Sequence, residues 1–117
     1  MDFFFSEEHE EFRRAVRRFA QKEIAPRASE VDQKAEFPWD NLKKMADFGL
    51  LRLGIPKQYG GEEADLITSS IAMEEIARVC ASTAQYLTTL PVAVFIDKFG
   101  TEEQKLTYLP GIGSGKI

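Results

Sequence analysis

Cysteine and histidine are nearly absent from this sequence, which contains only Cys80 and His9. A single cysteine forms no internal disulfide and leaves no cysteine pair for a metal site, a usage that fits a reducing compartment. Because no second histidine exists to share a ligand or a proton, we interpret His9 as a surface residue. The sequence therefore predicts neither a metal centre nor a histidine-based catalytic pair.

Strong charge of one sign and membrane-spanning apolar runs are also missing. A net charge of −4 with 44% hydrophobic residues is typical of a globular domain, and it argues against a general binder of nucleic acid or anionic membranes. The uncharged stretch between Arg78 and Asp97 is too polar in its first half to span a membrane. No basic region opens the chain, so we expect no signal peptide and a cytoplasmic location, or the mitochondrial matrix in a eukaryote.

Glycine and proline are concentrated in residues 49–61, which cannot form one regular helix. Gly49 follows an amphipathic run and is expected to cap its C-terminus with a positive φ. Pro56 favours extended backbone at Ile55, and Gly60-Gly61 is expected to be a flexible hinge before the next helix. This segment is predicted to be a packed connection between two helical hairpins.

Helical periodicity dominates the first part of the chain. Ser6 is a candidate N-cap for a long first helix, and Pro26 predicts a break near residues 22–25. Phe37-Pro38 opens a second helix that ends at Gly49. The expected apolar face of the first helix comprises Phe12, Val16, Phe19, Ala20, Ile24, Ala28 and Val31, and that of the second comprises Trp39, Leu42, Met45 and Ala46.

Three further helices are predicted after the central connection. Asp65 is expected to cap the third, with Met73 on its apolar side and Glu75 pointing elsewhere. The fourth, over residues 82–99, is expected to be the buried central rod because it carries almost no charge. Thr101 begins a capping box for the fifth. The result is an all-α fold, a helical bundle of about five helices over residues 1–110, with residues 111–117 as a flexible, glycine-rich end or linker.

Catalytic patterns are not evident in the residues alone. Arg13, Arg14, Arg17 and Arg18 form a basic stripe that we interpret as a solvated face, the commoner explanation, although it could bind an acidic partner. The adjacent acids Glu74-Glu75 diverge on a helix and so cannot flank a substrate. The polar side chains of the fourth helix must be satisfied internally or face a cavity, which makes this helix the best candidate for a ligand-facing surface.

Several blocks of the sequence, in order, resemble the N-terminal helical domain of the acyl-CoA dehydrogenases. They are residues 12–20 (FRRAVRRFA) with 23–28 (EIAPRA), 36–38 (EFP), 49–61 (GLLRLGIPKQYGG), 73–82 (MEEIARVCAS) and 99–110 (FGTEEQKLTYLP). The resemblance covers almost the whole chain. It implies an oxidoreductase with two more domains, a middle β-domain that would begin near the end of this sequence and a C-terminal helical domain.

The resemblance also implies the chemistry of the parent protein. FAD would lie between the two absent domains, a glutamate there would remove the substrate α-proton, and electrons would leave through an electron-transferring flavoprotein. The parent is expected to be a homo-oligomer, and this chain alone is expected to hold no cofactor and to be inactive. Carried over by position, the substrate-binding residues of the acyl-pocket wall are Thr83, Tyr86, Leu87 and Leu90, where a tyrosine would shorten the pocket.

Two alternatives to a dehydrogenase fragment remain open. The chain could be a stand-alone helical interaction module that kept the bundle without catalysis, or part of a related flavin oxidase or monooxygenase with the same architecture. The residues that would separate these reactions are expected outside this sequence.

Overall fold

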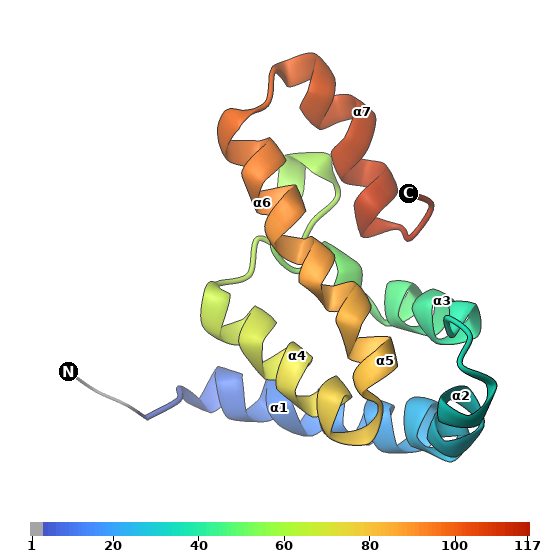
Figure 1. Cartoon of the computed structure of the whole chain (residues 1–117). Coiled ribbons are helices and arrows are strands. Elements are labelled where there is room, and N and C mark those ends of the chain that lie inside the picture. The colour runs from blue at the N-terminus through green and yellow to red at the C-terminus, as the bar shows by residue number, and fades with distance from the viewer. Residues whose placement is uncertain (1–3) are drawn as a thin grey trace.

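The computed structural model describes residues 4–117 and contains helices but no strand in that range, which confirms the all-α prediction. Besides α-helices it has a π-helix, η1, and short 3₁₀ helices, η2 to η5. Figure 1 shows how the α-helices are arranged. The elements are α1 (Glu7–Phe19), η1 (Ala20–Ile24), η2 (Ala25–Arg27), α2 (Ala28–Lys34), α3 (Trp39–Phe48), η3 (Leu50–Arg52), η4 (Lys57–Tyr59), α4 (Leu66–Val79), α5 (Ala81–Ala84), η5 (Gln85–Thr89), α6 (Leu90–Phe99) and α7 (Glu102–Gly113).

The predicted first helix begins and breaks where expected. Ser6 caps α1 by accepting the backbone N–H of His9 at 3.1 Å. Pro26 has no N–H to donate, and the helix passes through η1 and η2 at this point before α2 continues it. The break near residues 22–25 is therefore confirmed.

The second predicted helix is confirmed as α3, but one member of its apolar face is wrong. Gly49 ends the helix with φ +100°, as expected of a glycine cap. Leu42, Met45 and Ala46 are buried, whereas Trp39 is 68% exposed. Trp39 lies in the first turn, where the indole packs on Phe37 at a ring-centroid distance of 4.6 Å.

The central connection packs as predicted, with Leu51 and Ile55 fully buried and Tyr59 nearly so. Its end is not the flexible hinge that Gly60-Gly61 suggested. The amide of Gly61 donates to Pro56 at 3.1 Å, and a Cβ added at Gly61 would lie 1.8 Å from the carbonyl oxygen of Ile55. Glycine is required there because two backbone segments touch, which no side chain would permit.

The predicted fourth helix is not one buried rod. It divides into α5, η5 and α6, because Pro91 lacks an N–H and fits the first turn of a new helix better than the middle of an old one. Only Leu90 and Ala93 of α6 are buried, while Phe95 is 63% exposed. Helix α6 thus leaves the bundle and pairs with α7.

Helix α7 starts at the predicted capping box and runs past the predicted end. Thr101 Oγ1 accepts the amide of Gln104 at 3.2 Å, which confirms the cap. The helix continues to Gly113, so residues 111–113 are helical and not part of a flexible end. Beyond it, the amide of Ile117 donates to Gly111 at 3.2 Å. The proposed domain boundary at residue 110 stays a prediction.

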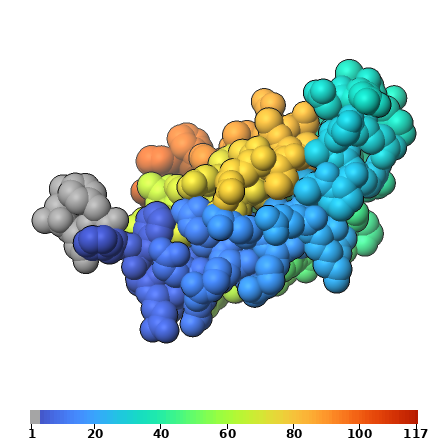
Figure 2. Space-filling view, turned by 90° about the horizontal axis from the view of Figure 1, so that it is seen from below, coloured from blue at the N-terminus to red at the C-terminus, as the bar shows by residue number. Residues whose placement is uncertain are grey.

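The helices surround two separate hydrophobic cores. The larger lies where α1, α3, α4 and α5 meet, and Figure 2 shows α1 lying beside α4 and α5 on one face. The smaller core comprises Ile55, Tyr59, Ala93, Leu109 and Ile112, between the central connection and the α6–α7 hairpin. In the described part of the chain, every helix is too short or too polar to cross a bilayer.

Candidate functional site

An apolar groove lies between α4 and α6, which spread apart from the α4–α5 turn (Figure 1). Its volume is about 440 Å³. The side chains that line it are mostly aliphatic because each helix turns part of its apolar face toward the other without touching it closely. The lining residues are Gly54, Leu66, Ser69, Ser70, Met73, Glu74, Leu87, Leu90, Pro91 and Val94.

Of the four residues carried over as substrate-binding, two line the groove and two do not. Leu87 and Leu90 line the groove, although each is buried by its neighbours in the domain. Thr83 and Tyr86 do not line it. Helical periodicity could not predict which of the four face the groove, because the chain changes from an α-helix to a 3₁₀ helix and back between α5 and α6. The two kinds of helix differ in residues per turn.

Thr83 belongs to a buried polar cluster between α3 and α5. Its hydroxyl accepts from Asn41 Nδ2 at 2.9 Å and donates to Cys80 Sγ at 3.1 Å. All three residues are buried, and Asn41 Oδ1 has no partner among the described residues. Thr83 is thus one of the internally satisfied threonines that a buried helix was expected to contain.

Tyr86 faces away from the groove. Its hydroxyl donates to the carbonyl oxygen of Ile117 at 2.8 Å, and its ring lies 6.0 Å from that of Phe37. The tyrosine therefore connects η5 to the end of the chain and to the α2–α3 loop. A role in shortening an apolar pocket stays a prediction for this residue.

Sequence reasoning missed the parts of the groove that come from other elements. Leu66 and Ser70 lie on α4, and Gly54 comes from the central connection. A Cβ added at Gly54 would lie 3.3 Å from Val94 Cγ2, so this glycine brings the connection close to α6. The predicted apolar side of the third helix contained Met73, but periodicity alone gave no sign of which helix it would face.

The lining of the groove is suited to binding an apolar group. Its polar side chains are Ser69, Ser70 and Glu74, and a carboxylate oxygen of Glu74 is engaged by Arg13 at 3.4 Å. No group of histidine, cysteine and acidic residues in the described part of the chain could hold a metal. Binding an aliphatic chain there would be favoured by about 25 cal/mol of free energy for each Å² of apolar surface removed from water.

The opposite side of α4 carries a buried ion-pair cluster. Glu75 is 2% exposed and accepts from Arg17 and from Arg13, with Arg13 Nη1 at 2.8 Å. The hydrogen bonds from Arg17 are the largest cause that lowers the pKa of Glu75 to about 2, against the opposing effect of burial. Two predictions are therefore wrong: Glu75 does not point away from the bundle, and Arg13 and Arg17 are not a purely solvated stripe.

His9 is likewise engaged in structure. Its Nε2 lies 3.1 Å from Asp65 Oδ2, and its Nδ1 lies 3.3 Å from the amide of Ser6. Asp65 also caps α4 by accepting the amide of Thr68 at 2.8 Å, as predicted. The histidine thus ties the beginning of α1 to the beginning of α4.

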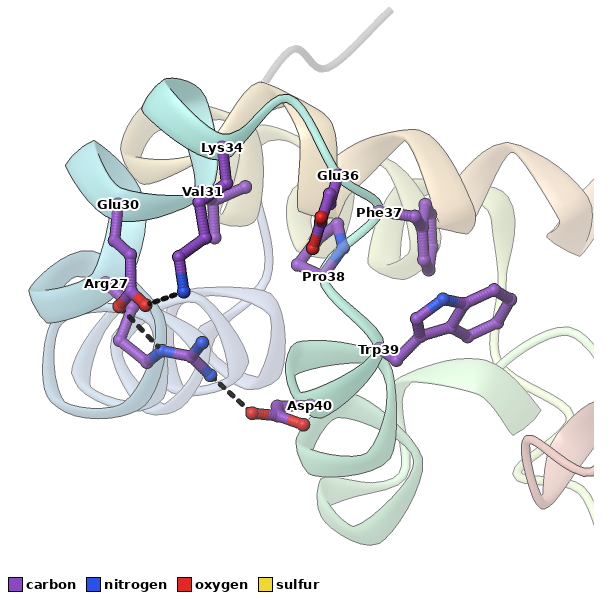
Figure 3. A pocket seen from close by; sticks show the side chains of 9 residues that line it. All are labelled: Arg27, Glu30, Val31, Lys34, Glu36, Phe37, Pro38, Trp39 and Asp40. Atoms are coloured by element: carbon purple, nitrogen blue, oxygen red, sulfur yellow. Dashed lines mark hydrogen bonds and ion pairs between the residues drawn. The ribbon is translucent and has the colours of Figure 1, made fainter.

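A smaller hollow of about 190 Å³ lies between α2 and α3 (Figure 3). Arg27 donates to Asp40 at 2.7 Å and Lys34 to Glu30 at 2.7 Å, so both basic side chains that border the hollow are already paired. Lys34, with Arg27, lowers the pKa of Glu30. These pairs join α2 to α3 across their loop, and the hollow has a mixed lining without the apolar continuity of the α4–α6 groove.

Comparison with known proteins matches this chain to one domain of a larger enzyme. The family model of the acyl-CoA dehydrogenase N-terminal domain matches residues 6–116. The short-chain specific acyl-CoA dehydrogenase of Clostridium acetobutylicum is 40% identical over 99% of this chain and 31% of its own length. The chain therefore spans about a third of the length of such relatives.

Solved structures give the same correspondence. Butyryl-CoA dehydrogenase from Megasphaera elsdenii matches with a TM-score of 0.87 and 28% identity, over 98% of this chain and 31% of that one. A chain in a structure of the electron transferring flavoprotein of Acidaminococcus fermentans matches with a TM-score of 0.90 and 32% identity, over 99% and 31%.

Proposed function

This chain belongs to the acyl-CoA dehydrogenase family, as its N-terminal helical domain, and on that premise we propose that it supplies one wall of the acyl pocket of a longer, FAD-dependent enzyme. The observation that carries the proposal is the apolar α4–α6 groove, which contains Leu87 and Leu90. In this proposal the reaction is the α,β-dehydrogenation of an acyl-CoA thioester, and the groove holds part of the aliphatic chain away from water.

The lining of the α4–α6 groove does not favour the pyrophosphate of FAD. A flavin dinucleotide carries a pyrophosphate, which proteins bind with basic side chains or with backbone amides at a helix N-terminus. The groove has no basic side chain in its lining. We therefore propose that the flavin, which accepts hydride in this chemistry, is bound by parts of the protein beyond these 117 residues, and that the isolated chain is inactive.

Two partners belong to the same proposal. An electron-transferring flavoprotein would reoxidise the flavin, in keeping with the likeness to a chain in a structure of such a protein. Other domains or a second subunit would cover the apolar residues that α6 exposes, which include Phe95 and Phe99.

A chimera tests the proposed wall. This chain would replace the matching N-terminal third of the Clostridium acetobutylicum enzyme, and kcat/KM would be compared for hexanoyl-CoA and butyryl-CoA. Because a methylene in an apolar pocket changes kcat/KM by about 10-fold or more, Leu90→Phe should lower the hexanoyl-to-butyryl ratio by about 10-fold. Leu106→Phe, at a position 64% exposed on α7, is the matched control and should leave the ratio unchanged. Equal ratios in both variants would contradict the proposal.

The isolated chain offers a second test. Purified protein of 13.2 kDa should hold no flavin absorbance and reduce no dye with acyl-CoA. Stoichiometric flavin or dye reduction would show that the chain is active alone. The alternative, a stand-alone interaction module, predicts that the native source produces a protein of this mass, whereas the proposed enzyme would be about three times as large.

A further inference from the structure

Different kinds of contact hold residues 4–80 together and attach residues 81–117 to them. Polar contacts hold α1 and α4 together along their length, from the hydrogen bond between His9 and the α4 N-cap Asp65 at one end to the ion pair Arg17–Glu75 near the other. Within residues 4–117, no ion pair connects residues 81–117 to residues 4–80; the pair formed by Lys105 and Glu102 is internal to α7. Residues 81–117 are therefore attached to the rest of the bundle without charge pairing.

The α6–α7 hairpin, residues 90–113, packs mainly on the smaller core, although Leu90 at its start belongs to the larger one. In the smaller core, Ala93, Leu109 and Ile112 contact Ile55 and Tyr59. One side-chain hydrogen bond connects the hairpin to the earlier part of the described chain, from the Tyr59 hydroxyl to Glu102 Oε2 at 2.7 Å. The hydrogen bond is also the main reason that the pKa of Tyr59 is raised to about 12.

The connection between the hairpin and the rest of the bundle is suited to bending. Helix α5 is followed by the 3₁₀ helix η5, and Pro91 then removes one backbone donor at the start of α6. The apolar groove separates α6 from α4 on the same side. A rotation at η5 would widen or narrow the groove without breaking the contacts between α1 and α4.

We propose that the α6–α7 hairpin is a separate cooperative unit that opens at η5 and so gates the α4–α6 groove. Opening exposes mainly the smaller core and breaks the hydrogen bonds that Tyr59 and Tyr86 donate to Glu102 and Ile117, while the ion pairs between α1 and α4 remain. It therefore costs less free energy than unfolding α1 and α4. That an acyl chain occupies the groove rests on the proposed function above; the opening itself does not depend on it.

Hydrogen exchange of the 117-residue chain, followed by mass spectrometry across a series of urea concentrations, tests the unit. The helical amides of α6 and α7 should exchange together, at least about 10-fold faster than those of α1 and α4. If the amides of α1, α4, α6 and α7 all exchange at one common rate, the proposal is wrong.

Two variants make the test specific. Tyr59→Phe removes the hydrogen bond to Glu102 and should speed exchange in α6 and α7 about 10-fold, while α1 and α4 keep their rates.

A second variant combines Gly54→Cys and Val94→Cys in a Cys80→Ala background. A Cβ at residue 54 lies 3.3 Å from Val94 Cγ2, so the two thiols can form a disulfide. The oxidised form should slow exchange in α6.

The outcomes distinguish the opening of the hairpin from the proposed acyl-pocket wall. If Tyr59→Phe speeds exchange equally in all helices, or if the oxidised variant exchanges in α6 as fast as its reduced form, the hairpin is not a separate unit. If exchange behaves as expected but the Leu90→Phe chimera keeps its chain-length ratio, the gating stands and the acyl-pocket wall fails.

Discussion

Arg17 and Glu75 form a two-point ion pair between α1 and α4, although 58 positions separate them in the chain. Arg17 Nε donates to one carboxylate oxygen at 3.0 Å and Nη2 to the other at 2.9 Å. Planar, bidentate geometry of this kind is the strong form of an arginine–carboxylate contact. The pair fixes the position of α4, whose other side forms one wall of the apolar groove.

Replacing Glu75 with glutamine should destabilise the fold by about 3 kcal/mol, because three arginines, Arg13, Arg17 and Arg78, lose their buried charge partner. Urea unfolding of the two proteins measures the difference. Glu74→Gln is the matched control: its side chain is 61% exposed, and its loss should cost less than about 0.5 kcal/mol. Equal effects at both positions would contradict a structural role for the Glu75 cluster.

Acid should weaken the protein through the same residue. The folded-state pKa of Glu75 is about 2, below its ordinary value of 4.5, so its contribution is complete above about pH 5 and is lost as the pH falls toward 2. Urea midpoints measured from pH 6 to pH 2 should fall for the native sequence and fall less steeply for Glu75→Gln. Parallel curves for the two proteins would show that Glu75 does not carry the acid sensitivity.

Gly61→Ala should prevent folding or cost more than about 3 kcal/mol, because its Cβ would lie 1.8 Å from the Ile55 carbonyl oxygen. Gly60→Ala is the control in the adjacent position. No atom lies within 4 Å of a Cβ there, but φ is +85°, so only the left-handed backbone penalty of about 1 kcal/mol applies. Thermal unfolding followed by circular dichroism would rank the two; a milder loss at position 61 would refute the close approach.

Thr101→Ala should destabilise the protein by about 1 kcal/mol through loss of the α7 cap. Thr107→Ala, in the same helix, removes a hydroxyl that donates to the Glu103 carbonyl at 2.7 Å without capping anything. Because alanine has the higher helix propensity, that control should be neutral or slightly stabilising. An unchanged unfolding midpoint for Thr101→Ala would mean that the cap carries no net stability.

Leu87→Asp should abolish the native fold, since the side chain is 0% exposed and a carboxylate there would be buried without a partner. Leu106→Asp, on the exposed side of α7, should fold normally. Size-exclusion chromatography with near-ultraviolet circular dichroism distinguishes the two results. Native spectra for Leu87→Asp would show that η5 is not part of the core.

The features that the sequence predicted correctly are local. Ser6, Asp65 and Thr101 cap helices because their side chains reach amides three residues ahead, a contact that needs no other element. Pro26 breaks a helix, and Gly49 ends one, for equally local reasons of backbone geometry. The family resemblance rested on blocks that include Pro26, Gly49 and Thr101, and it is confirmed by the match to the N-terminal domain.

Tertiary contacts decided the features that sequence reasoning missed. Periodicity showed that α1 and α4 each have an apolar face, but it could not show that Arg17 meets Glu75 beside that face or that Thr83 turns to Asn41. The course of α6, which leaves the bundle and opens the groove, depends on its packing with α7. Caps and breaks follow from atoms a few residues apart, whereas the orientation of a helix depends on partners that only the folded chain brings together.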